Sequence, residues 1–129
     1  MNIEHIAIWT TNLEATREFH EKYFMAKAGQ KYTNPVTKFE SYFLHFTSGA
    51  RLELMHQPGI QPRQEDLGKP TASYAHISFA TGSVESVNEL TERFRLDGYR
   101  VISDPRTTGD GYYESVVVDP DGNFIELTV

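Results

Sequence analysis

The sequence predicts an α+β fold made of two tandem βαβββ modules, because two short strings recur in the same order. Ile-Glu-His-Ile-Ala-Ile-Trp at 3–9 is echoed by Tyr-Ala-His-Ile-Ser-Phe-Ala at 74–80. Arg-Leu-Glu-Leu-Met at 51–55 is echoed by Phe-Ile-Glu-Leu-Thr at 124–128. The histidine-to-glutamate separations also agree, at 48 positions (53 − 5) in the first half and 50 (126 − 76) in the second. Two matches at nearly equal spacing indicate a duplicated structural unit.

The first copy is predicted to be a strand, a helix and three more strands. Alternating, isoleucine-rich residues 2–9 favour a strand. Thr11 or Asn12 is a candidate helix N-cap, and Gly29 is expected near the helix end. Apolar or small residues at helical spacing form one helix face: Leu13, Thr16, Phe19 and Tyr23. The remaining strands are expected at 30–34, 39–48 and 51–56.

The second copy repeats this order. A strand is predicted at 74–81, Ser83 is the candidate N-cap, and Gly98 stops the helix. One helix face is formed by Val84, Val87, Leu90 and Phe94. Strands are expected at about 99–103, 112–118 and 124–129, with a tight turn at 119–123. The whole chain, 1–129, is interpreted as one domain, with module one at about 1–57, a Pro- and Gly-rich linker at about 58–73 and module two at about 74–129.

Composition excludes several classes of function. The chain has 129 residues, a net charge of −6 and a sequence pI near 5.3, so no basic stripe is available to bind nucleic acid. It has no cysteine, which excludes a disulfide framework and a thiolate metal ligand. No apolar run approaches bilayer length, and the first residues do not resemble a signal peptide. We therefore expect a cytoplasmic protein without membrane contact.

Four polar side chains lie on the strand faces that are opposite the apolar residues. Side chains alternate along a strand, so the Ile and Leu neighbours of these residues define the helix-packed face. The four residues are His5, Glu53, His76 and Glu126. They are expected on the concave face that a curved sheet would enclose. Two imidazoles and two carboxylates suit one divalent ion such as Ni, Zn, Co, Mn or Fe better than Ca or Mg.

Each of these residues has a plainer interpretation when taken alone. A single histidine on a strand is usually structural or exposed, and a single glutamate between leucines is usually the solvent side of the strand. The repetition of the pair favours a metal site over that interpretation. His45 and His56 have no counterpart in the other copy of the repeat, and His20 lies on the polar side of the predicted helix. We interpret them as structural or surface residues, although His56 could border the pocket.

From Glu4-His5-Ile6-Ala7 to the segment 119–127, the sequence resembles the vicinal oxygen chelate superfamily, and within it small bacterial glyoxalase I-like proteins. The resemblance implies mixed sheets that curl around one metal ion. Bacterial glyoxalase I has His, Glu, His and Glu at the four matching positions, whereas extradiol dioxygenases and fosfomycin-modifying enzymes generally lack a ligand at the position of Glu53. Methylmalonyl-CoA epimerase, another member of the superfamily, commonly has Gln at that position. Glu53 therefore favours the glyoxalase-like class.

The resemblance also implies a reaction. A hemithioacetal of a 2-oxoaldehyde and a thiol would rearrange through an enediolate, with Glu126 as the base and Glu53 as the second carboxylate. His5 and His76 would be ligands only. Family members are often dimers whose sites are shared between chains, so a homodimer is expected. Another metal-dependent member of the superfamily, or a non-catalytic small-molecule binding or resistance protein, remains an alternative.

The candidate thiol pocket departs from the family pattern. Trp9 occupies a position where glutathione-dependent members often have Arg, and Gln57 one where they often have Asn. The loop 107–112 contains no basic residue, although Arg106 is adjacent. Tyr112 lies in the segment 109–113, which is either a lid over the pocket or a plain loop. The metal site is matched and the glutathione site is not, so the thiol and the substrate class stay open.

Overall fold

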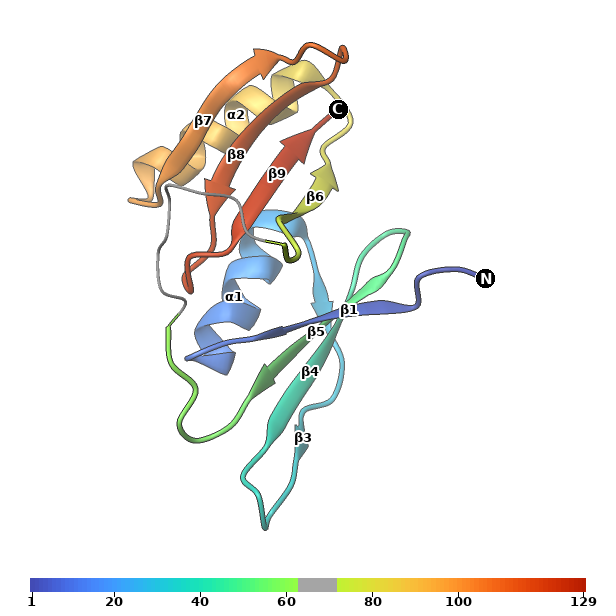
Figure 1. Cartoon of the computed structure of the whole chain (residues 1–129), viewed down its shortest axis with the longest axis vertical. Coiled ribbons are helices and arrows are strands. Elements are labelled where there is room, and N and C mark those ends of the chain that lie inside the picture. Colours follow the sequence, from blue (N-terminus) through green and yellow to red (C-terminus); the bar gives the residue numbers. More distant parts are fainter. Residues whose placement is uncertain (63–71) are drawn as a thin grey trace. The chain divides into compact units, whose positions relative to one another are not determined.

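The computed structural model describes residues 1–62 and 72–129, and they form two compact units (Figure 1). The first unit ends at Pro62, and the second comprises the described residues from 72 onward. Each unit has one helix and one mixed sheet, so the predicted α+β class with two βαβββ modules is confirmed. Most of the predicted linker, 58–73, lies outside the described residues. No helix within the described ranges is long and apolar enough to cross a bilayer.

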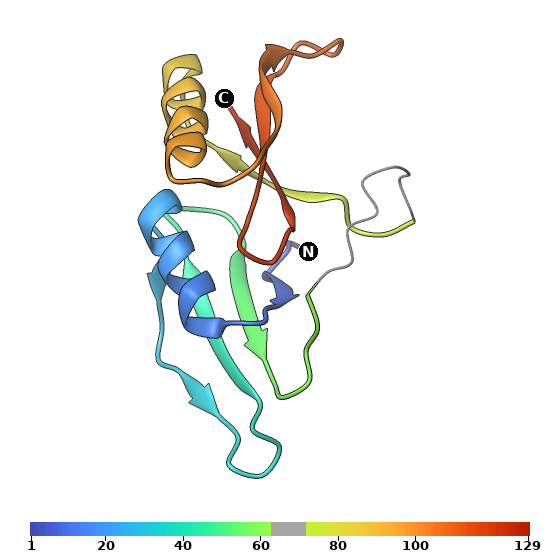
Figure 2. The ribbon, with the colours of Figure 1, turned by 90° about the vertical axis from the view of Figure 1, so that its left-hand side faces the viewer.

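The first unit is a curved sheet with one helix on its face (Figures 1 and 2). Its elements are β1 (His5–Trp9), α1 (Leu13–Phe24), β2 (Lys27–Ala28), β3 (Tyr32–Thr33), β4 (Glu40–His45) and β5 (Arg51–His56). The strand order is β1-β5-β4-β2, and β3 also pairs with β4. β1 runs parallel to β5, and the remaining pairs are antiparallel. This order places the two strands that carry His5 and Glu53 side by side.

Several predicted boundaries in this unit are wrong. β1 begins at His5 and not at residue 2, and β4 ends at His45, before the predicted end at 48. The larger errors concern the end of the helix and the strand after it. α1 ends at Phe24 because Met25 adopts a left-handed conformation (φ 53°), and the Ala26 N–H then donates to the carbonyl of His20. Gly29 therefore does not terminate the helix. It lies instead between the two short strands β2 and β3, which replace the single strand expected at 30–34, and its N–H donates to the carbonyl of Phe43. A left-handed methionine has no strong sequence signal, which explains the error.

The second unit repeats the arrangement with four strands. Its elements are β6 (His76–Ala80), α2 (Val84–Leu96), β7 (Val101–Thr107), β8 (Tyr113–Val118) and β9 (Phe124–Thr128). The order is β6-β9-β8-β7, with β6 parallel to β9. Ser83 caps α2 through the Ser86 N–H, just as Asn12 caps α1 through the Ala15 N–H. β7 is longer than the predicted strand, because its bulged pairing with β8 continues to Thr107.

The core of each unit lies between the helix and one face of the sheet. Leu52 and Leu54 of β5 are buried in the first unit, and Ile125 and Leu127 of β9 are buried in the second. These strands are central, so the predicted alternation is clear in them. α1 covers less of the edge strand β1, where Ile6 remains 38% exposed. The opposite, helix-free faces carry the four candidate ligands.

His20 is not on a polar helix face as predicted. It is 1% exposed, its Nδ1–H donates to the Thr16 carbonyl, and its ring packs near Phe19 and Phe24. Burial lowers its pKa to about 4, so the imidazole is neutral at pH 7. Its structural role is as expected, but its position is in the core of the first unit.

Candidate metal centre

His5 and Glu53 form a pair on the helix-free face of the first sheet. They come from the neighbouring parallel strands β1 and β5, and His5 Nε2 lies 3.9 Å from Glu53 Oε2. Ala7 is the residue directly opposite Glu53 in the register. The Glu53 side chain is 16% exposed and the His5 side chain 40%. One nitrogen and one oxygen donor therefore face each other in a partly covered position.

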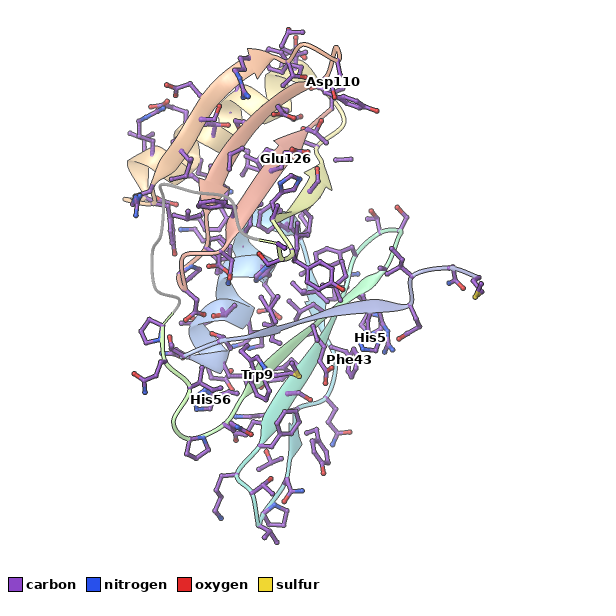
Figure 3. The ribbon with its side chains drawn as sticks, viewed as in Figure 1. His5, Trp9, Phe43, His56, Asp110 and Glu126 are labelled. Carbon is purple, nitrogen blue, oxygen red and sulfur yellow. The ribbon has the colours of Figure 1, made fainter. Side chains whose placement is uncertain are left out.

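A small cluster around His5 determines which ring nitrogen is available. Its Nδ1 lies 2.5 Å from Oε2 of Glu4, and Glu4 also forms an ion pair with Arg51. The edge of the ring meets Phe43 at 5.4 Å between centroids (Figure 3), and the Arg51 guanidinium lies 4.2 Å from the Phe43 centroid. The hydrogen bond from His5, with help from Arg51, lowers the pKa of Glu4. With Nδ1 engaged, Nε2 is the nitrogen directed at Glu53.

His76 and Glu126 form the equivalent pair in the second unit. They come from the parallel strands β6 and β9, and His76 Nε2 lies 3.4 Å from Glu126 Oε2. The other carboxylate oxygen, Oε1, accepts a hydrogen bond of 2.6 Å from the Ser78 hydroxyl. The Glu126 side chain is 17% exposed, close to the value for Glu53. The repeat thus produces two pairs with the same residue types and nearly the same exposure.

A second carboxylate stands next to Glu126, and the sequence interpretation missed it. Glu114 lies on β8, two positions from Val116, which is the cross-strand partner of Glu126. Partial burial, followed by the charge of Glu126, raises the pKa of Glu114. Arg106 Nη1 lies 3.5 Å from Glu114 Oε1 and donates to Ser103 at 2.7 Å. In the structure Glu114 alternates with the buried Ser115 and Val117, but the run of three valines at 116–118 gave no alternation in the sequence from which this face could be predicted.

Within the described ranges, the structure brings the predicted ligands together as two pairs. No group of three or more His, Cys, Asp or Glu side chains among the described residues is arranged to hold a metal ion. The complete set of four is therefore a proposal, and each pair is one half of it. His5 and Glu53 are one half-site, and His76 and Glu126 are the other.

The predicted pocket residues have different surroundings. Trp9 is 44% exposed and meets Phe39 edge-to-face at 6.0 Å, and Phe39 lies 6.1 Å from Tyr32, so an aromatic row continues along the first sheet. Gln57 is exposed, and its carbonyl accepts the Ile60 N–H in the turn after β5. Tyr112 is 60% exposed beside the loop before β8.

Arg106, predicted next to a loop, lies within β7. His56, which could have bordered the pocket, instead donates from Nδ1 to the carbonyl of Thr10 at 2.9 Å. This hydrogen bond connects the end of β5 to the segment between β1 and α1. The Thr10 N–H in turn donates to the carbonyl of Met55 in β5. Its role in the described structure is therefore structural. His45 is exposed at the end of β4.

The donor separation in the second half-site fits a divalent transition-metal ion, and the separation in the first is wider than a bound ion would set. Two donors that bind one ion at about 2.1 Å are about 3.0 Å apart at octahedral angles and about 3.4 Å apart at tetrahedral angles. The separation of 3.4 Å between His76 Nε2 and Glu126 Oε2 agrees with the tetrahedral value, and 3.9 Å between His5 Nε2 and Glu53 Oε2 is slightly wider. A cation would also offset the negative charge of Glu126 and Glu114.

The duplicated units, each with a helix on one face of a mixed sheet and a histidine–glutamate pair on the other, define a tandem βαβββ protein. The family model described as "Glyoxalase/Bleomycin resistance protein/Dioxygenase superfamily" matches residues 2–127, and the chain belongs to this superfamily. The family is typically metal-dependent. The resemblance deduced from the sequence is therefore confirmed at the level of family and fold.

Relatives at low identity include both characterised and uncharacterised proteins. The chain is 26% identical to the uncharacterized protein YqjT of Bacillus subtilis, with 97% of this chain and 96% of that protein aligned. It is 30% identical to a lactoylglutathione lyase of Arabidopsis thaliana over 95% of this chain, but it spans only 42% of that enzyme. Among solved structures, the trypanothione-dependent glyoxalase I of Leishmania major matches with a TM-score of 0.77 and 25% identity, over 99% of this chain and 86% of that one.

Proposed function

We propose that the protein is a metal-dependent, glyoxalase I-like lyase that acts on the hemithioacetal of a 2-oxoaldehyde and a thiol. The observation that carries the proposal is the recurrence of one histidine–glutamate pair at equivalent positions in both units, at 3.9 and 3.4 Å. Relatives named as lactoylglutathione lyase and glyoxalase I support the reaction class. Superfamily members that bind their metal ion through three protein ligands would not need a carboxylate at position 53.

The residues that would hold the ion are His5, Glu53, His76 and Glu126, from one chain or from two chains of a homodimer. When bound, a divalent ion such as Ni, Zn, Co, Mn or Fe supplies Lewis-acid stabilisation of the negative charge that develops on substrate oxygens. Glu126 would take the proton from one substrate carbon and return it to the next. The adjacent Glu114 increases the negative charge around this position, and the Ser78 hydroxyl holds one of the Glu126 oxygens.

The test combines metal analysis with turnover. The protein is purified without chelators and analysed for bound metal, and methylglyoxal adducts of several thiols are offered as substrates. Glu126→Gln should keep most of the metal but lose turnover by more than about 100-fold, because an amide cannot accept the proton. Glu89→Gln, a change of the same kind on the exposed side of α2, is the control and should match the wild type.

Two results would contradict this assignment. Unchanged turnover in the metal-loaded Glu126→Gln variant would exclude Glu126 as the base. A wild-type protein that binds none of the five metals would exclude the whole site. Deuterium uptake from solvent into the product measures the proton transfer directly and separates it from loss of binding.

A second candidate function rests on the aromatic row Trp9, Phe39 and Tyr32. Trp9 and Tyr32 are exposed on either side of the half-buried Phe39, and these rings offer a stacking surface for a planar, apolar small molecule. Such a surface favours a binding or resistance protein, or a metal-dependent enzyme with an aromatic substrate. Tight binding of a planar compound by metal-free protein, without turnover of any thiol adduct, would favour this candidate. The cytoplasmic location and the homodimer remain predictions.

A further inference from the structure

The two half-sites differ at one register position. In the first unit Ala7 of β1 is the cross-strand partner of Glu53, and in the second unit Ser78 of β6 is the cross-strand partner of Glu126. Ala7 and Ser78 each stand two residues after the histidine of their pair. They are therefore equivalent positions of the duplicated module. Ala7 places a methyl group beside Glu53, whereas Ser78 places a hydroxyl beside Glu126.

The hydroxyl of Ser78 makes a short, charge-assisted contact. Its Oγ donates to Oε1 of Glu126 at 2.6 Å, while Oε2 of the same carboxylate lies 3.4 Å from His76 Nε2. Oε1 of Glu126 thus contacts Ser78, and Oε2 faces His76. Rotation of the carboxylate group would break the hydrogen bond from Ser78. An alanine at position 7 has no donor with which to restrict Glu53 in this way.

We propose that Ser78 is a positioning residue for Glu126 and makes the two half-sites unequal. It holds Oε1, so that Oε2 is the oxygen presented to the ion and the substrate. Glu53, opposite Ala7, can rotate more freely as a ligand. This inference rests on the proposed function, in which Glu126 is both ligand and base, and it explains how two carboxylates of a duplicated module can have different roles.

Metal titration of four proteins tests the inference without any turnover assay. Wild type, Ser78→Ala, Ser78→Thr and Ala7→Ser are titrated with Zn²⁺ and Co²⁺ against a chromophoric chelator. Removal of an outer-shell partner typically weakens metal binding about 10- to 100-fold, so Ser78→Ala should lose about 10-fold and Ser78→Thr, which keeps the hydroxyl, should retain wild-type affinity. Ala7→Ser should leave the affinity unchanged or raise it. Ser78 is exposed on the edge strand β6, so alanine there should not disturb the core.

A double-mutant cycle then shows whether Ser78 acts through Glu126. Adding Ser78→Ala to a Glu126→Ala background, which has no side-chain oxygen for the hydroxyl to hold, should have no further effect on metal affinity, whereas adding it to Glu53→Ala should still cost about 10-fold. Equal losses in both backgrounds, or wild-type affinity in Ser78→Ala, would overturn the positioning role. A wild-type protein that binds neither of these ions, nor Ni, Mn or Fe, would overturn the proposed function as well. Metal binding without thiol–aldehyde turnover would contradict only the reaction.

Discussion

Nδ1 of His5 lies 2.5 Å from the carboxylate of Glu4, the residue immediately before it, and this contact leaves Nε2 directed at Glu53. A carboxylate behind a ligating imidazole fixes its tautomer and raises its basicity. The equivalent position before His76 is Ala75, so in the second unit the preceding residue offers no carboxylate to the histidine. In the second unit the supported residue is the glutamate, through Ser78.

Removing the carboxylate of Glu4 should weaken metal binding. Glu4→Ala is expected to lower the affinity for Zn²⁺ about 10-fold, because His5 would be free to rotate and to change tautomer. Chelator competition measures the affinity. Glu85→Ala, which removes an exposed acid from the first turn of α2, should have no effect. Equal affinities of wild type and Glu4→Ala would show that the contact does not support a ligand.

Acidification should destabilise the first unit through His20. Burial holds its pKa at about 4, below the ordinary value of 6.5, so the unfolded chain takes up a proton first as the pH falls. The stability contributed by the neutral imidazole is complete above pH 6.5 and is lost progressively between pH 6.5 and 4, on the order of 2 kcal/mol by pH 5.

Urea unfolding of metal-free protein at pH 7.5 and pH 5 measures this loss. His20→Leu should show a smaller drop in free energy of unfolding between the two pH values than the wild type. His45→Gln, at an exposed histidine, should keep the full drop. If His20→Leu and wild type fall equally, another group is responsible for the acid sensitivity.

The turn before β9 should depend on Asp119. Its Oδ1 accepts the N–H groups of Asp121 and Asn123 at 2.9 and 2.8 Å, and its Oδ2 accepts from the Asn123 side chain at 2.8 Å. Asp119 is only 4% exposed, so removing its carboxylate leaves three partly buried donors without their acceptor. Asp119→Ala should lower the free energy of unfolding by about 2–3 kcal/mol.

Asp119→Asn provides the graded control for that experiment. Its single amide oxygen can still accept the two backbone N–H groups, but its NH₂ would face the NH₂ of Asn123. Its stability should therefore lie between those of wild type and Asp119→Ala in thermal or urea unfolding. Equal stability of all three proteins would contradict a role for Asp119 in the turn.

The two helix caps should be equivalent, since they occupy the same position of the repeat. Asn12 and Ser83 accept the N–H groups of Ala15 and Ser86 at 3.1 Å in both cases. Asn12→Ala and Ser83→Ala should each cost about 1 kcal/mol of stability, measured by urea unfolding. Asn12→Asp should cost little, because aspartate caps equally well. A larger effect of Thr11→Ala than of Asn12→Ala would contradict the assignment of the cap.

Local patterns in the sequence predicted most of the elements. Strand alternation predicted that Glu53 and Glu126 lie on the sheet face away from their buried Leu and Ile neighbours, because the period of two is a property of the strand itself. The cap at Ser83 and the end of α2 before Gly98 were also predictable, since capping chemistry is local. The end of α1 at Met25 was not, because a left-handed methionine lacks a local signal.

The sequence by itself determined the fold class, the duplication and the two histidine–glutamate pairs, because all of these depend on local periodicity and on spacing along the chain. Only the tertiary structure decided that His20 lies in a core, that Glu4 contacts His5, and that Ser78 and Glu114 stand beside Glu126. These relationships depend on cross-strand register and on which rotamers the neighbouring side chains permit, neither of which can be read from the order of residues.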